Sequence, residues 1–174
     1  NAQSGFSYGS LAAIIGSAGN LHNYAKEQRL WKRLGLALIG DIRQQGVRDR
    51  AAALEHGYSP ARRSVMWVIG ASILRTQTAR VDKETGEVKR ESGYWRDVYD
   101  KRKAYEQAKN EAGEYAEQAH RRLGEAKFDK KTAAFKAYAE GKLPPMHIHA
   151  RTQRYIEKML LRELDGTVFG RQCP

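Results

Sequence analysis

Residues 59–77 read SPARRSVMWVIGASILRTQ, and this stretch decides the fold class. Ser59 followed by Pro60 is a favoured start for a helix, because the serine caps free backbone amides and proline needs no amide partner at the first helical position. The residues that follow are apolar around most of the helical circumference, as in a helix that is covered on several sides. The sequence therefore predicts a central core helix from Ala61 to about Gln77.

The flanking sequence predicts further helices. Apolar residues recur at every third or fourth position in Leu21–Gln45, Tyr94–Ala126 and His149–Leu164. The second of these segments carries only a narrow stripe of small and aromatic residues, which favours an antiparallel helix pair or a helical arm. In residues 79–93, two short runs flank Lys83–Gly86, a pattern typical of an exposed β-hairpin or loop.

We therefore expect a mainly α-helical, multi-helix fold with a long helical arm or hairpin and one small β-hairpin or loop near residues 80–92. The expected organisation is a helical domain over residues 1–78, the exposed hairpin or loop over 79–93, and a long helical hairpin or arm with the C-terminal helix over 94–174. The last part is expected to pack with the first as one domain. The Gly- and Ser-rich start is expected to be a flexible lead-in that ends at Ser10, the N-cap of a first helix.

The charge balance indicates the class of partner. The chain has 31 Lys and Arg against 20 Asp and Glu, a net charge of +11 and a pI of about 9.8. The excess is spread along the chain, so any positive patch has to be assembled by folding. A basic surface attracts phosphate polymers in a manner that weakens steeply with salt. We expect a nucleic-acid partner, DNA or RNA; the alternative is that the charge serves only solubility.

A helix-turn-helix pattern occupies residues 50–75. Asp49 can cap a first helix over Arg50–His56, and Gly57 permits the left-handed turn that ends it. A small residue, Ala53, three positions and then glycine is the spacing that lets two such helices approach closely. An ordinary buried helical hairpin would show the same pattern.

The second helix of a helix-turn-helix unit lies in the major groove with its first turn toward bases and phosphates. That turn would present Ser59, Arg62 and Arg63. The planar guanidinium fork of arginine can pair with guanine or with phosphate. These three residues are therefore candidate nucleic-acid contacts.

The stretch resembles the N-terminal helix-turn-helix of phage small terminase subunits, in which an Ala-rich helix and Gly-Tyr-Ser lead into the second helix. The similar residues are Ala51, Ala52, Gly57, Tyr58, Ser59 and Pro60, with Ile69-Gly70 and Ile73-Leu74 downstream. The resemblance implies viral DNA recognition and a ring-forming oligomer. His56 and Arg63 depart from the pattern, because such units bury apolar side chains at those places.

Basic residues also accompany aromatic ones further along the chain. Lys101, Arg102 and Lys103 follow Tyr99, and a basic pair stands at Arg121-Arg122. Exposed aromatic rings can stack on bases while neighbouring cations meet phosphates. We expect the aromatic stripe to be core, and the five basic side chains to be solvated or to face phosphates.

A third pattern is His147-Ile148-His149, with Tyr155 six residues later. On a strand, both imidazoles would lie on one side and could bind a divalent metal. The pattern is similar to the His-hydrophobic-His element of single-strand nicking enzymes, and the likeness implies a metal-dependent nuclease with Tyr155 as nucleophile. The sequence predicts few strands and no third ligand, so the alternative is that the histidines orient the last helix.

The sequence contains no motif for nucleotide binding by a phosphate loop or for redox chemistry by paired cysteines. We find no Gly-rich phosphate loop and no CxxC, and the single Cys173 cannot form an internal disulfide. The longest apolar run, Val65–Leu74, is half the ~20 residues of a membrane span, and no signal peptide is visible. We expect a cytoplasmic protein without a cofactor or a membrane partner.

The preferred hypothesis is a basic, helical nucleic-acid-binding protein without catalytic activity, from a phage or other mobile element. The first alternative is a helical assembly or protein-interaction module, homo-oligomeric or with another partner. The second is the metal-dependent nuclease.

Overall fold

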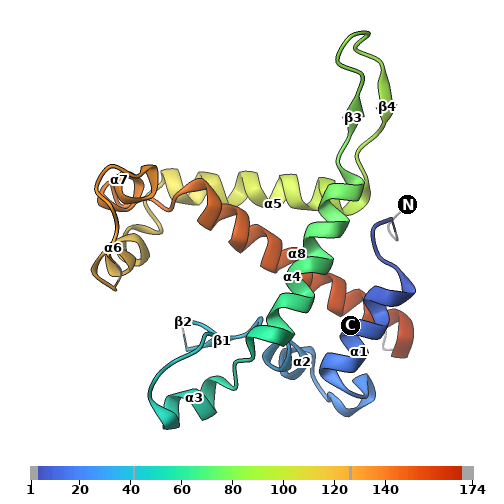
Figure 1. The fold of residues 1–174 in the computed structure, drawn as a ribbon, viewed down its shortest axis with the longest axis horizontal. Coiled ribbons are helices and arrows are strands. Elements are labelled where there is room, and N and C mark those ends of the chain that lie inside the picture. The colour runs from blue at the N-terminus through green and yellow to red at the C-terminus, as the bar shows by residue number, and fades with distance from the viewer. Residues whose placement is uncertain (1–3, 41, 126, 170–174) are drawn as a thin grey trace. The chain divides into compact units, whose positions relative to one another are not determined.

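The computed structural model describes residues 4–40, 42–125 and 127–169, with side chains as far as residue 164. The fold is mainly α-helical with two small antiparallel hairpins, which confirms the expected fold class (Figure 1). The helices are α1 (Tyr8–Ala18), the short 3-10 helix η1 (Leu21–Asn23), α2 (Glu27–Arg33), α3 (Arg50–His56), α4 (Pro60–Gln77), α5 (Tyr94–Glu111), α6 (Ala116–Glu125), α7 (Ala133–Ala139) and α8 (Pro145–Phe169). The hairpins pair β1 (Leu38–Ile39) with β2 (Ile42–Arg43), and β3 (Arg80–Val81) with β4 (Val88–Arg90).

The chain divides into two compact units. Unit 1 combines Asn1–Arg96 with Arg154–Pro174, and unit 2 is Asp97–Gln153. Helices α5 and α8 therefore each contribute to both. This division cuts across the ranges expected from the sequence, because the last helix supplies buried side chains to unit 1, among them Ile156 and Leu161.

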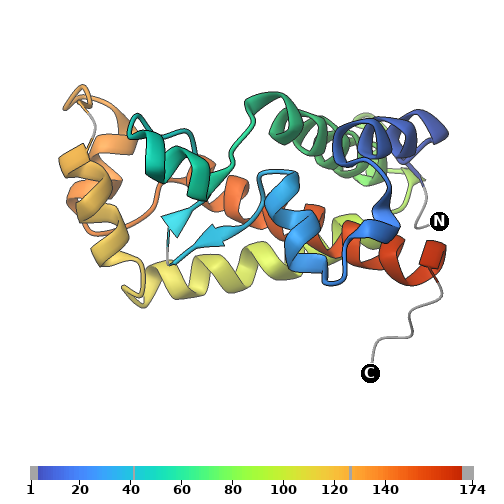
Figure 2. The ribbon, with the colours of Figure 1, turned by 90° about the horizontal axis from the view of Figure 1, so that it is seen from below.

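The predicted central helix is confirmed as α4. The Ser59 hydroxyl accepts the Arg62 amide at 3.4 Å, and Pro60 takes the first helical position. The side chains of Met66 and Ile73 are fully buried. Helices α1 and α4 pack together, as Figure 2 shows. Ile14 of α1 is fully buried, whereas Val68 of α4 stays 63% exposed, so α4 is covered on part of its circumference only.

The β3–β4 hairpin is confirmed, and the end of α4 holds its two ends together. The hairpin extends from the C-terminal end of α4 (Figure 1). The Gln77 side chain donates to the Ser4 carbonyl at 2.8 Å and accepts the Trp95 amide at 2.7 Å. A Cβ at Gly93 would lie 2.8 Å from Gln77 Oε1, so only glycine fits where the chain returns from the hairpin.

The start of the first helix differs from the expectation. Ser7, not Ser10, is the N-cap of α1, and Ser10 is the third helical residue, whose hydroxyl accepts the Ser7 amide. The pair forms a capping box in which each serine satisfies a backbone amide of the other. The helix therefore begins at Tyr8, three residues earlier than the sequence suggested.

The continuous helix expected from Leu21 to Gln45 is wrong. The segment forms η1, α2 and the β1–β2 hairpin instead. Gly35 and Gly40 have φ angles of 75° and 57°, a conformation that ends helices and that other residues rarely adopt. Leu38, one of the apolar residues of this segment, is 61% exposed in the hairpin.

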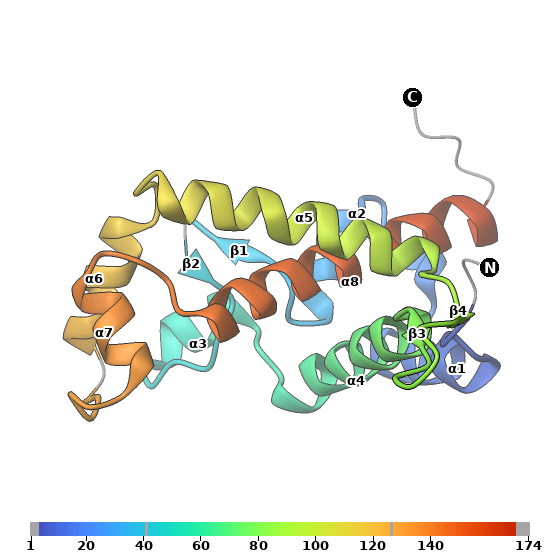
Figure 3. The ribbon, with the colours of Figure 1, turned by 90° about the horizontal axis from the view of Figure 1, so that it is seen from above.

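The long helix expected from Tyr94 to Ala126 is two helices, α5 and α6. The break follows Glu111, and Gly113 turns the chain with a φ of 79°. Helices α6 and α7 pack side by side (Figure 3). The apolar core of unit 2 consists of Tyr115, Ala119, Tyr138, Leu143 and Ile148.

A buried carboxylate ties the helices of unit 2 together. Glu106 is 2% exposed, and its oxygens accept hydrogen bonds from Arg102 at 2.9 Å, from the Tyr115 hydroxyl at 2.5 Å and from Arg151 at 3.0 Å. Burial raises the pKa of Glu106, but the hydrogen bonds from Tyr115 and Arg102 and the charge of Arg151 outweigh it and hold the pKa below its ordinary value. The carboxylate is therefore ionised at neutral pH.

The last helix begins at Pro145, four residues before the expected start at His149. Proline is favoured at the first helical position, so the Pro144-Pro145 pair starts the helix as well as ending the preceding segment. No helix among the described residues is both long enough and apolar enough to cross a lipid bilayer.

Candidate nucleic-acid interface

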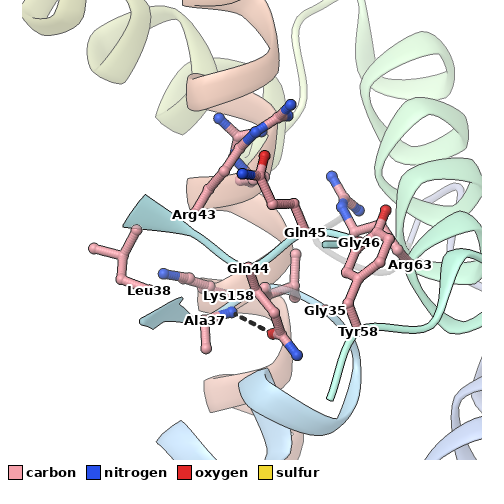
Figure 4. A pocket seen from close by; sticks show the side chains of 12 residues that line it. Gly35, Ala37, Leu38, Arg43, Gln44, Gln45, Gly46, Tyr58, Arg63 and Lys158 are labelled. Carbon is pink, nitrogen blue, oxygen red and sulfur yellow. Dashed lines mark hydrogen bonds between the residues drawn. The ribbon is translucent and has the colours of Figure 1, made fainter. Parts of the chain in front are cut away.

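A pocket in unit 1, which we call the cationic pocket, combines four positive side chains. It has a volume of about 150 Å³ and is formed by the α2–β1 connection, the segment from β2 to Gly46, the start of α4 and helix α8 (Figure 4). The cations that line it are Arg43, Arg63, Arg154 and Lys158. No Asp or Glu is among the described residues that line it, so the lining carries charge of one sign.

Gln44 fixes the wall of the cationic pocket. Its side chain is 4% exposed and donates to the carbonyl oxygens of Lys32 at 2.9 Å and His56 at 2.5 Å. Its Oε1 accepts the Ala37 amide at 3.3 Å, the bond dashed in Figure 4. One buried amide thus joins the β1–β2 hairpin to the ends of α2 and α3, and this wall is set before any ligand arrives.

Gly35 permits the close approach of α4 to this wall. A Cβ at this position would lie 3.2 Å from Arg63 Cβ and 3.4 Å from the Tyr58 ring. Its positive φ also disfavours any other residue. The glycine that ends the α2 segment is therefore also the residue against which Tyr58 and Arg63 pack.

Arg63 serves the interior of unit 1. Its Nη1 lies 2.8 Å from Glu157 Oε2, and Glu157 is fully buried. The atoms are close but not aligned as a hydrogen bond, so the contact is an ion pair. The guanidinium carbon also lies 5.6 Å from the centre of the Trp67 ring. Arg63 was expected to face a groove of nucleic acid, but the buried carboxylate offsets its charge.

Lys158 is the most unusual cation of the pocket. It follows Arg154 by one helical turn on α8, so both side chains leave the same face. Its ammonium lies 4.9 Å from the Trp31 ring centre, in cation–π contact. Burial and the nearby charge of Arg154 lower the pKa of Lys158 below its ordinary value. A positive charge here is disfavoured, and a bound anion would relieve that cost.

More cations adjoin the pocket at the end of α2. The Arg62 guanidinium donates to the Arg33 carbonyl at 3.3 Å, and Lys32, the residue before it, accepts from Gln44. The side chains of Lys32 and Arg33 are exposed. Unit 1 has 19 Lys and Arg against 11 Asp and Glu, whereas unit 2 has 12 against 9, so most of the net charge belongs to unit 1.

The caps and the turn of the predicted helix-turn-helix are present, but α3 and α4 are not among the described elements that pack extensively together, so the expected close approach of the two helices is not seen. Asp49 caps α3, and Gly57 has the left-handed conformation with a φ of 55°. His56, one of the two departures from the family pattern, is 9% exposed, and its Nδ1 accepts the Gln45 amide at 3.2 Å. Ser59 is occupied in capping α4, whose contact partner is α1. Of the first-turn candidates, Arg62 is half-buried beside the cationic pocket.

The five basic candidates of unit 2 form two groups. Lys101 is exposed on α5, Arg102 binds Glu106, and the Lys103 ammonium lies 5.9 Å from the Tyr99 ring centre. On α6, Arg121 and Arg122 lie 4.0 Å and 3.8 Å from Glu125 oxygens, distances of loose surface ion pairs. Arg102 is therefore a structural residue, while the other four have accessible charge.

The proposed metal pair does not have the geometry that it needs. His147 and His149 lie in helix α8, where side chains two positions apart point to nearly opposite sides. His147 Nδ1 is 3.2 Å from the Tyr138 hydroxyl, and His149 Nδ1 is 2.7 Å from the Tyr99 hydroxyl. No group of three metal-ligating side chains occurs among the described residues. Tyr155 belongs to unit 1, so the strand-based site is corrected to two histidines that pack against tyrosines.

Sequence reasoning missed Arg43, Arg154 and Lys158. Arg43 lies in β2, within a segment that was expected to be helical, and its setting depends on the turns at Gly35 and Gly40. Arg154 and Lys158 were not singled out, because the sequence carries no sign of what their helical face meets.

Comparisons of the chain with protein-family models, with curated proteins and with solved structures found no match.

Proposed function

We propose that the protein binds nucleic acid through the cationic surface of unit 1, acting as a binding protein rather than as an enzyme. The observation that carries the proposal is the cationic pocket, which is lined by Arg43, Arg154 and Lys158 with no carboxylate among the described lining residues. The charge of Arg63, which also lines it, is offset by Glu157. Like charges gathered in a partly buried site repel one another, and a phosphate partner would offset that repulsion.

The surroundings of the pocket favour a polymer over a small anion. Lys32 and Arg33 are exposed at the end of α2, close in the chain to the pocket residue Gly35, and the Arg62 guanidinium from the first turn of α4 donates to the Arg33 carbonyl. A row of cations can neutralise successive phosphates and release their counterions, which makes the affinity depend steeply on salt. A single small anion would use the pocket alone.

Unit 2 offers a second set of contacts. Lys101 and Lys103 lie on α5, and Arg121 and Arg122 lie on α6. We include these four residues as phosphate contacts of lower individual weight, since exposed cations paired loosely with carboxylates contribute little each. They would add to the salt dependence without conferring sequence preference.

The direct test is a titration of labelled random duplex DNA, single-stranded DNA and RNA at several salt concentrations, followed by fluorescence anisotropy. The proposal expects binding to at least one of the three polymers, with log affinity falling linearly against log salt. Absence of binding to all three at low salt would overturn it. Tight self-association that persists in high salt, without nucleic-acid binding, would support the assembly module instead.

A further inference from the structure

We infer that the cationic pocket seats one phosphate group of the bound strand, with Arg43, Arg154 and Lys158 as its ligands. The inference rests on the proposed function and adds to it a defined site. Nucleic-acid binding by a basic surface requires no pocket, so the two statements can fail separately.

The size of the pocket matches a phosphate group. An apolar cavity of about 150 Å³ can hold a benzene molecule, which has six heavy atoms, whereas pockets for drug-sized ligands measure roughly 300–1,000 Å³. The cationic pocket, also about 150 Å³, therefore has room for the five heavy atoms of a phosphate group but not for a whole nucleotide. The sugar and base would remain outside.

The charge and donor groups of the pocket suit a tetrahedral oxyanion. Arg43 comes from β2, and Arg154 and Lys158 come from one face of α8, so donors reach the pocket from two elements. Arginine offers paired N–H groups that match phosphate oxygens, and lysine adds a compact charge. Burial, and after it the neighbouring charge of Arg154, lowers the pKa of Lys158, so an anion in the pocket would stabilise its charged form.

The pocket is also largely pre-formed. Gln44 holds the hairpin wall through three hydrogen bonds, and Gly35 lets Tyr58 and Arg63 close against the chain. The Arg63–Glu157 ion pair fixes the start of α4 relative to the C-terminal part of α8 within unit 1. Little backbone ordering would be needed on binding, which favours affinity for a small group.

The first test uses inorganic phosphate and amide NMR spectra of the full chain. Phosphate, compared with chloride at equal ionic strength, should shift the amides of the segment 35–46 and of Arg154 and Lys158. Lys158→Met, which keeps an unbranched chain against Trp31 but removes the charge, should reduce these shifts. The control, Lys130→Gln/Lys131→Gln, removes two exposed cations of unit 2, one charge more than Lys158→Met, and should leave these shifts unchanged. In the contrary case, phosphate shifts amides throughout both units, or shifts them equally in Lys158→Met and wild type. Either result would identify an adventitious ion only and overturn the inference.

The second test measures binding of oligonucleotides. Lys158→Met should weaken binding roughly five- to tenfold and reduce the salt slope by about 0.9 for a duplex, the contribution of one phosphate contact. The control variant, with two charges removed, should change affinity less than this single substitution. Suppose that wild type binds, and that Lys158→Met and the control variant lose the same affinity for each positive charge removed. The pocket inference then fails, while the proposed function stands. If wild type binds none of the polymers, the proposed function fails, whatever phosphate does.

Strands with and without a 5′-phosphate identify the source of the group. Equal affinity for the two strands, with both bound more weakly by Lys158→Met than by the control variant, would assign a backbone phosphodiester to the pocket. Tighter binding of the 5′-phosphorylated strand, abolished in Lys158→Met, would assign a terminal phosphate. Either result supports a phosphate seat, and a preference for the 5′-phosphate that is unchanged in Lys158→Met would count against it.

Discussion

Two basic residues of the cationic pocket, Lys158 and Arg63, should have opposite effects on stability. The lowered pKa of Lys158 means that the folded protein holds this proton less tightly than the unfolded chain does, so the charge opposes folding. Lys158→Met should leave the unfolding temperature unchanged or raise it. Arg63→Met should lower the free energy of unfolding by about 3–5 kcal/mol, because it leaves the buried Glu157 without its ion pair. Both are measured by thermal and urea unfolding; equal destabilisation by the two changes would make Lys158 a structural residue.

The phosphate seat also predicts a pH dependence at Lys158. Anion binding needs the protonated side chain, so affinity should fall as pH rises through the pKa of Lys158. That pKa lies below the value of about 10.4 of an ordinary lysine, so the loss should begin while exposed lysines remain charged. Anisotropy titrations from neutral to alkaline pH would show the decline in wild type. Lys158→Met should lack this decline, and a decline retained in full by the variant would assign it to another group.

Glu106 predicts the response of unit 2 to acid. Its pKa is lowered in the folded state, so its stabilising effect is present above the ordinary glutamate pKa of about 4.3 and is lost as pH falls through the lower folded value. Unit 2 should therefore lose stability below about pH 4, as hydrogen exchange of its amides would show. Glu106→Gln should cost about 3–5 kcal/mol at neutral pH and weaken the acid dependence, because Arg102 and Arg151 lose their shared carboxylate. Acid dependence unchanged in the variant would place its origin elsewhere.

The helix ends that are marked by capping residues could be predicted from the sequence. The start of α4 follows from Ser59-Pro60, and the ends of α3 follow from Asp49 and Gly57, since caps act within one turn of the chain. The β1–β2 hairpin was not predicted. The apolar spacing from Leu21 to Gln45 fits a helix equally well, and only the glycines interrupt it.

Two glycine-to-alanine substitutions test whether Gly35 is required for the turn that ends α2 and for the packing at the cationic pocket. Gly35→Ala should destabilise unit 1 by about 1–3 kcal/mol, because φ is 75° and the new Cβ would press on Arg63 and Tyr58. Gly16→Ala should stabilise by about 0.5–1 kcal/mol, since Gly16 lies within α1 and nothing is within 4 Å of a Cβ there. Urea unfolding compares the two. A neutral Gly35→Ala would show that the close approach at the cationic pocket is not required.

For the whole molecule, composition predicted a polyanion partner but not where the charge gathers. Of the candidates chosen from the sequence, Arg63 pairs with the buried Glu157 and Arg102 with the buried Glu106. A buried carboxylate needs a positive partner, and that partner can come from any element that packs against it. The residues of the cationic pocket that the sequence missed come from β2 and α8, which are more than 100 residues apart in the chain. Their convergence depends on tertiary structure and leaves no local pattern.

The central claim is that the positive charge of unit 1 acts together on a polymer of phosphates. The measurement that tests it most directly is the slope of log affinity against log salt for duplex DNA, compared among wild type, Arg43→Gln/Arg154→Gln/Lys158→Met and the control Lys127→Gln/Lys130→Gln/Lys131→Gln. Both triple variants remove three positive charges. We predict that the unit 1 variant lowers the magnitude of the slope by about 2–3 while the control changes it by less than about 1. Equal slopes in the two variants, or a wild-type affinity that does not respond to salt, would contradict the account.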